Sequence, residues 1–193
     1  MLTLPAKVRR KKQPYLYIRS RLSRRNLAKQ AILFYGELRD FVAARGITGV
    51  GPGFMRYMAV DRDGGLDMEF GYFTDRLHTG GGPVRASMLP SGTFMSMEWT
   101  GPFEKLREVN AMLNGWAHHN GVEWDTVETP DGVGYGCRIE IYHATQRHVP
   151  SPEQFRTEVA IMVRSVAEQH ATDEPAQFGA GSASSFSHLP MDN

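Results

Sequence analysis

Cysteine is almost absent from this chain, since Cys137 is the only one among 193 residues. A single thiol cannot form an intrachain disulfide, and it excludes zinc sites built from several cysteines. Long apolar runs are also missing: no stretch approaches the roughly 18 residues that span a bilayer, and no hydrophobic signal core lies near the N-terminus. We therefore expect a cytoplasmic protein that makes no membrane contact, and we interpret Cys137 as a small core residue.

Acidic residues are missing from the first 25 positions, although nine Lys and Arg residues lie there. Basic arms bind nucleic acid or anionic surfaces in some proteins. The alternative interpretation is a solvated, frayed N-terminus. We favour this alternative, because the patch is short, no DNA-reading motif follows it and the net charge of the whole chain is only +1. Nucleic acid is therefore not the partner we expect.

The rest of the composition is that of a globular protein, with 41% hydrophobic and 22% charged residues. The length fits a single domain with tails. We predict a basic N-terminal arm over residues 1–12, one domain over residues 13–165 and a flexible tail over residues 166–193. The tail is rich in Ala, Gly, Ser and Pro, and we assign no function to it.

Periodicity along the chain predicts the same series of elements twice. The first series is a strand over 13–22, a helix from Leu27 to just before Gly46, and strands over 54–60 and 66–74 joined by a DRDGG turn. After a short strand over 84–89, the second series is a strand over 93–100, a helix from Pro102 to Gly121, and strands over 134–142 and 158–163. This tandem strand-helix-strand-strand repeat predicts an α+β fold. We expect a curved antiparallel sheet with two helices on one face and a central ligand cleft on the other.

The strand Gly134–Tyr142, GYGCRIEIY, is the centre of the functional prediction. Ile139 and Ile141 alternate with polar residues, so we expect the isoleucines beneath the helices and Glu140 on the open face. An acid fixed on a rigid strand suits cation recognition or proton transfer. The alternative is a solvated carboxylate paired with Arg138 or with a base on a neighbouring strand.

Large side chains are predicted to line the same open face around Glu140. Aromatic and methionine surface beside a carboxylate suits a flat, apolar and often cationic ligand, through ring stacking and cation–π attraction. The candidate ligand-binding residues are Tyr57, Phe70, Tyr72, Met97, Trp99, Glu140 and Tyr142. No metal or cofactor is expected, because the histidines lack ligand spacing and Gly80–Gly82 is not followed by a phosphate-loop lysine.

Several segments resemble the GyrI-like effector-binding family over roughly Gln13 to Arg164. They are GPGFMRY (Gly51–Tyr57), RASMLPSGTFMSMEWTGPFEKL (Arg85–Leu106), the spacing from Leu113 to Trp116, RIEIY (Arg138–Tyr142) and FRTEVAIMV (Phe155–Val163). This family includes ligand domains of multidrug-sensing transcription activators and a standalone gyrase-inhibitory protein. The resemblance implies a tandem fold with an aromatic cleft, in which Glu140 matches the family's buried acid and Trp99 its cleft aromatic. Regulators of the family carry a helix-turn-helix module ahead of the ligand domain. Only about a dozen residues precede the first strand here, so we do not expect direct transcription control by this chain alone.

Three functional hypotheses follow. The first is a standalone binder that senses or sequesters a planar, apolar or cationic compound. The second is a hydrolase that detoxifies cyclopropane-bearing electrophiles, as some standalone GyrI-like proteins do, with Glu140 as general base and Tyr57 or Tyr142 donating a hydrogen bond. The third is a protein-binding module that contacts gyrase or a regulator through the basic N-terminus.

Overall fold

The computed structural model describes residues 1–165, and the tail predicted for residues 166–193 lies outside the described residues. Within residues 1–165 the chain forms nine strands, two α-helices and three short 3-10 helices. In chain order these are β1 (Ala6–Arg10), β2 (Gln13–Ser23), η1 (Arg24–Asn26), α1 (Leu27–Ala44), β3 (Val50–Asp61), β4 (Gly65–Thr74), β5 (Arg85–Leu89), β6 (Gly92–Thr100), η2 (Phe103–Lys105), α2 (Leu106–His119), β7 (Thr126–Thr129), β8 (Gly132–Ala144), η3 (Pro152–Gln154) and β9 (Arg156–Met162). Neither α1 nor α2 is long and apolar enough to cross a membrane.

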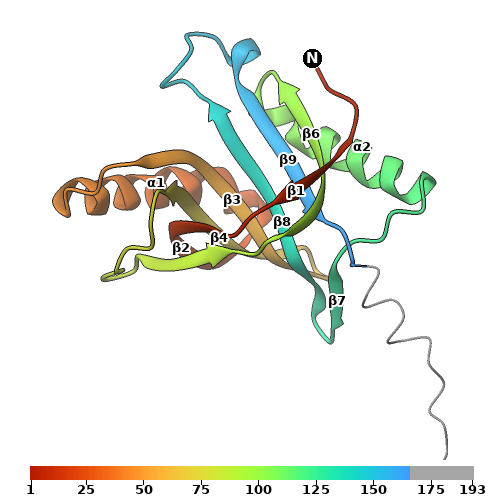
Figure 1. The fold of residues 1–193 in the computed structure, drawn as a ribbon, viewed down its shortest axis with the longest axis horizontal. Coiled ribbons are helices and arrows are strands. Elements are labelled where there is room, and N and C mark those ends of the chain that lie inside the picture. The colour runs from red at the N-terminus through yellow and green to blue at the C-terminus, as the bar shows by residue number, and fades with distance from the viewer. Residues whose placement is uncertain (166–193) are drawn as a thin grey trace, which may run out of the picture.

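All of these strands pair antiparallel in one sheet of order β1-β6-β9-β8-β3-β4-β2-β5, with β7 paired to β8 (Figure 1). The two predicted units are visible in this order, because β3-β4-β2 and β8-β9-β6 have the same internal arrangement. They meet where β3 pairs with β8. The strand ahead of each unit pairs with the other unit: β1 with β6, and β5 with β2. The predicted α+β tandem fold, with its curved antiparallel sheet and two helices on one face, is confirmed.

The sheet curls into a half-barrel. Strands β5 and β6 lie near opposite ends of the strand order but are joined by only Pro90 and Ser91, so the two ends of the sheet must come close together. The inner face of the curl is filled by buried apolar side chains: Tyr15, Phe54, Phe73, Leu89, Phe94, Cys137, Ile139, Ile141 and Ala160. Cys137 is thus a core residue, as predicted.

This packing corrects one prediction. Ile139 and Ile141 do not lie beneath the helices but inside the half-barrel. The alternating residues of β8 therefore face the helices, and Glu140 is among them. Helix α1 packs on β2 and β4, and α2 packs on β6, so that β3 and β8 run between the two helices (Figure 1).

The helix ends follow the local sequence. Gly46 and Gly121, just beyond α1 and α2, have φ of 59° and 64°. This left-handed conformation favours glycine and terminates a helix. At the start of α1, neither Ser23 nor Asn26 caps the helix with its side chain.

The basic N-terminal segment is not frayed. Residues Ala6–Arg10 form β1 and pair with β6 from Ala6↔Ser96 to Arg10↔Gly92. The Met1 ammonium donates a hydrogen bond to the Thr100 carbonyl oxygen at 2.7 Å. Arg10 is half-buried and pairs with the buried Glu158. The interpretation as a frayed arm was wrong for these residues, because they form an edge strand, although Ala6, Lys7 and Arg9 are exposed.

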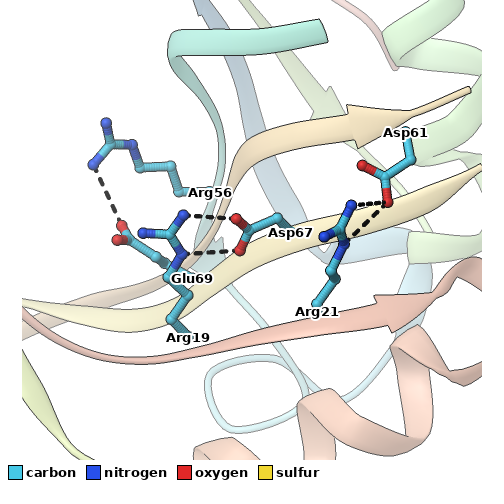
Figure 2. A network of polar contacts seen from close by, with 6 residues as sticks. All are labelled: Arg19, Arg21, Arg56, Asp61, Asp67 and Glu69. Atoms are coloured by element: carbon cyan, nitrogen blue, oxygen red, sulfur yellow. Dashed lines mark hydrogen bonds and ion pairs between the residues drawn. The ribbon is translucent and has the colours of Figure 1, made fainter. Parts of the chain in front are cut away.

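Three arginine–carboxylate pairs lie on strands β2, β3 and β4 and are drawn in Figure 2: Arg19–Asp67, Arg21–Asp61 and Arg56–Glu69. The Arg19–Asp67 pair has two hydrogen bonds, of 2.9 and 2.6 Å, but is partly exposed, and such pairs contribute little to stability. The Arg56–Glu69 pair is buried, and the Tyr15 hydroxyl joins it by donating to Glu69 at 2.8 Å.

Candidate functional site

Glu140 is a buried carboxylate between the two halves of the fold, with a relative exposure of 5%. Its oxygens accept three hydrogen bonds. Tyr57 on β3 and Asn110 on α2 donate to Oε1 at 3.1 and 2.9 Å, and Tyr142 donates to Oε2 at 3.0 Å. The donors come from both units and from a helix, so the carboxylate lies where the repeats meet.

No positive charge touches this carboxylate. Among residues 1–165, no Lys, Arg or His nitrogen lies within 4.0 Å of a Glu140 oxygen. Arg138, the next residue of β8 on the same face, stacks instead on the ring of Tyr57, with its guanidinium carbon 4.6 Å from the ring centroid. Its Nη2 donates to Asn110 Oδ1 at 3.0 Å, and its buried Nε has no partner. The pairing with Arg138 considered from the sequence is therefore absent.

The tyrosines around Glu140 are protonated donors. Burial raises the pKa of the Tyr57 hydroxyl, and the charge of Glu140 raises it further. Burial and then Glu140 act in the same direction on the pKa of Tyr142. On α1, burial raises the pKa of Tyr35 well above its ordinary value, with smaller contributions from Tyr72 and Glu140. At neutral pH these phenols can donate to the carboxylate but carry no charge.

The other predicted site residues share the face of Glu140 but lie farther along the sheet. The cross-strand register gives the row Phe70, Met55, Glu140, Val159, Met97, so that Phe70 and Met97 are each two strands away from Glu140. In a second row, Tyr142 is followed by Thr157 and then Trp99.

The helices cover this face, which corrects the prediction of an open one. Phe70 packs against Phe34 of α1, with ring centroids 5.2 Å apart, and Tyr72 packs against Tyr35 at 5.5 Å. Met97 and Trp99 belong to the cluster beneath α2. The structure therefore brings Tyr57 and Tyr142 to Glu140, while the remaining predicted residues form the helix–sheet packing around it.

Sequence reasoning missed Asn110, Tyr35 and Thr157. Asn110 lies one turn after Leu106 and three residues before Leu113, at the spacing of the buried face of α2. A polar residue at a buried position of a helix could have been recognised from the sequence as a candidate site residue. Thr157 is fully buried, and its hydroxyl has no partner within the described part of the chain. Nothing in the sequence distinguishes Thr157 from an ordinary strand residue.

Two cavities lie near the helices. One, of about 200 Å³, is lined by Arg39, Val42, Ala43, Val50, Tyr72 and Arg147. A second, of about 600 Å³, lies at the turn from β2 into α1 and is lined by Arg21, Leu22, Ser23, Arg24, Arg25, Asp61, Asp63, Gly64 and Gly65. Neither lining includes Glu140, but Tyr72 of the smaller cavity touches Tyr35. Within residues 1–165, no group of three or more His, Cys, Asp or Glu side chains is arranged to hold a metal ion.

No protein-family model and no curated protein matches the chain. Solved structures do match it. The C-terminal domain of EcmrR aligns with a TM-score of 0.63 and 16% identity, over 84% of this chain and 98% of that domain. The chain spans only 58% of the EcmrR protein in its complex with DNA.

Two further structures are similar. SAV2435 bound to tetraphenylphosphonium aligns with a TM-score of 0.55 and 12% identity, over 88% of this chain and 99% of that one. A hydrolase from Listeria innocua aligns with a TM-score of 0.52 and 16% identity, over 83% of this chain and 91% of that one. At these identities the likeness is one of fold, and this chain shares the fold of the EcmrR C-terminal domain and of SAV2435.

Proposed function

We propose that this chain is a GyrI-like small-molecule-binding protein, which takes up a planar, apolar or cationic compound beside Glu140, between α1 and α2. The observation that carries the proposal is the buried carboxylate that only uncharged groups contact. Taking an ionised carboxylate out of water costs several kcal/mol. Three charge-assisted hydrogen bonds offset part of that cost, but no cationic group touches the carboxylate.

A cationic ligand would supply the missing charge. At an effective dielectric constant of about 20, a cation about 4 Å from the carboxylate gains about 4 kcal/mol. The rings of Tyr57, Tyr142 and Tyr35 would add stacking and cation–π attraction. The similar fold of SAV2435, whose structure holds the aromatic cation tetraphenylphosphonium, supports this ligand class.

Ligand entry requires side-chain movement, because Glu140 is only 5% exposed. Tyr35 is the residue we expect to move. It contacts Tyr72 and lies within electrostatic range of Glu140. Rotation of Tyr35 away from its hydrogen bond to the Phe54 carbonyl oxygen, now 2.6 Å, would open space between α1 and the carboxylate.

Calorimetric titration with tetraphenylphosphonium and with neutral triphenylphosphine oxide tests the proposal. Glu140→Gln is expected to weaken binding of the cation by at least about tenfold and to leave the neutral compound nearly unaffected. Glu98→Gln, at an exposed carboxylate on β6, is the matched control and should change neither affinity. Equal affinity of the cation for wild type and Glu140→Gln would contradict the proposal, and so would the absence of binding to the wild type.

The second candidate is a hydrolase, suggested by the similar fold of the Listeria innocua enzyme. Here Glu140 would deprotonate water for attack on a cyclopropane-bearing electrophile, with Tyr57 or Tyr142 as hydrogen-bond donor. The three donors on Glu140 argue against this role, since they occupy three of the four lone pairs of the carboxylate and leave only one position, on Oε2, for a proton. Turnover that is lost in Glu140→Gln would favour this candidate. Contact with gyrase or a regulator remains a prediction.

A further inference from the structure

The cavity of about 200 Å³ is lined by two positively charged residues and by no negatively charged one. Arg39 comes from α1 and Arg147 from the connection between β8 and η3, so two arginines distant in sequence border the same space. Tyr72 lines it from β4. The remaining lining is apolar, from Val42, Ala43 and Val50, and it contains no aspartate or glutamate.

Neither arginine has a carboxylate partner in the part of the chain that the structure describes. The guanidinium groups of Arg39 and Arg147 make no ion pair and no hydrogen bond there. Along α1, the positions three and four residues from Arg39 are Tyr35, Gly36, Val42 and Ala43, none of which is acidic. The arginines drawn in Figure 2 differ, because each of them pairs with Asp or Glu.

Two like charges beside a partly enclosed space repel each other, and an anion placed between them removes that repulsion. Guanidinium groups present planar pairs of donors that match a carboxylate. The Tyr72 hydroxyl makes no hydrogen bond to any residue in 1–165 and offers a third donor. The volume equals that of about six or seven water molecules, which is enough for a ring or a short branched chain against the apolar wall.

We propose that this cavity binds a small organic anion, a monocarboxylate with an aromatic or branched apolar body. Arg39 and Arg147 bind the carboxylate, Tyr72 donates to it, and Val42, Ala43 and Val50 contact the apolar body. This site does not depend on cation binding at Glu140. Inorganic phosphate would satisfy the arginines but not the apolar wall, so a carboxylate is the better match.

The test is a titration of the full chain with sodium benzoate at low ionic strength, followed by calorimetry and by NMR shifts of the arginine side chains. Benzamide has the same shape without the charge, and inorganic phosphate has the charge without the ring. Wild type is expected to bind benzoate saturably and at least about tenfold more tightly than either other compound.

Arg39→Gln and Arg147→Gln are each expected to weaken benzoate binding by about tenfold. Arg107→Gln, at an exposed arginine of α2, is the matched control and should bind as wild type does. Glu140→Gln should also keep benzoate binding, which separates this proposal from the proposed function. Because both arginines are at least partly exposed, we expect the variants to fold, and circular dichroism checks this. Absence of saturable benzoate binding, equal binding of phosphate, or the same affinity in Arg39→Gln, Arg147→Gln and Arg107→Gln would overturn the proposal.

Discussion

Glu158 offers a quantitative prediction about what stabilises the half-barrel. It lies on β9, inside the curl, and accepts hydrogen bonds from Arg10 and Ser96, with His143 Nε2 3.3 Å away. Burial alone would raise the pKa of this carboxyl group. The contacts with His143, Arg10 and Ser96 outweigh burial and lower the pKa from its ordinary 4.5 to about 2. The shift corresponds to about 3 kcal/mol of free energy of unfolding at neutral pH.

The sign follows from the lower pKa in the folded state. The stabilisation is fully present above about pH 4.5 and is lost as the pH falls toward 2. Glu158→Gln should therefore be less stable than wild type by about 3 kcal/mol at neutral pH, and the two proteins should approach equal stability near pH 2.

Urea unfolding, followed by tryptophan fluorescence at several pH values between neutral and pH 2, measures this difference. Glu128→Gln, at an exposed carboxylate on β7, is the control and should follow wild type throughout. A difference between wild type and Glu158→Gln that stays constant with pH, or is absent at neutral pH, would refute the reasoning.

Three further predictions follow. Arg138→Gln removes the charge stacked on a site tyrosine and should raise the affinity for tetraphenylphosphonium by up to about tenfold in calorimetry; unchanged or weaker binding would contradict a cation site at Glu140. Tyr142→Phe removes one donor from the buried Glu140 carboxylate and should lower the free energy of unfolding by about 1–3 kcal/mol in urea titrations, whereas wild-type stability would contradict that hydrogen bond. Gly132→Ala would place a Cβ atom 2.2 Å from a backbone oxygen of β3 and should lower the free energy of unfolding by more than about 2 kcal/mol in urea titrations. Gly115→Ala, with open space on α2, should raise it by about 0.5–1 kcal/mol. Similar effects of the two substitutions would contradict the close packing of β8 on β3.

Most elements of the fold could be predicted because their signals are local. The DRDGG turn joins β3 to β4, and Gly46 and Gly121 follow the two helices, as expected. The order of these elements was enough to predict the tandem repeat. The pairing of β1 with β6 could not be predicted from the sequence, because it joins segments more than 80 residues apart and depends on the curl of the whole sheet.

The sequence predicted the wrong face of the sheet for the Glu140 side chain, and the reason is physical. In a sheet with one solvated face, the apolar residues of a strand lie beneath the helices. Here both faces are covered, one by the helices and the other by the curl of the sheet, so Ile139 and Ile141 fill the half-barrel. The alternation in β8 correctly separated Glu140 from the isoleucines but could not tell which face was which. The contact with Asn110 depends on how α2 docks, which periodicity does not specify.

The most direct test of the central claim is a crystal structure of the chain with tetraphenylphosphonium. We predict the cation between α1 and α2, against the carboxylate of Glu140, with Tyr35 rotated away from the Phe54 carbonyl oxygen. A cation bound elsewhere, with Glu140 still held by Tyr57, Tyr142 and Asn110, would contradict the account.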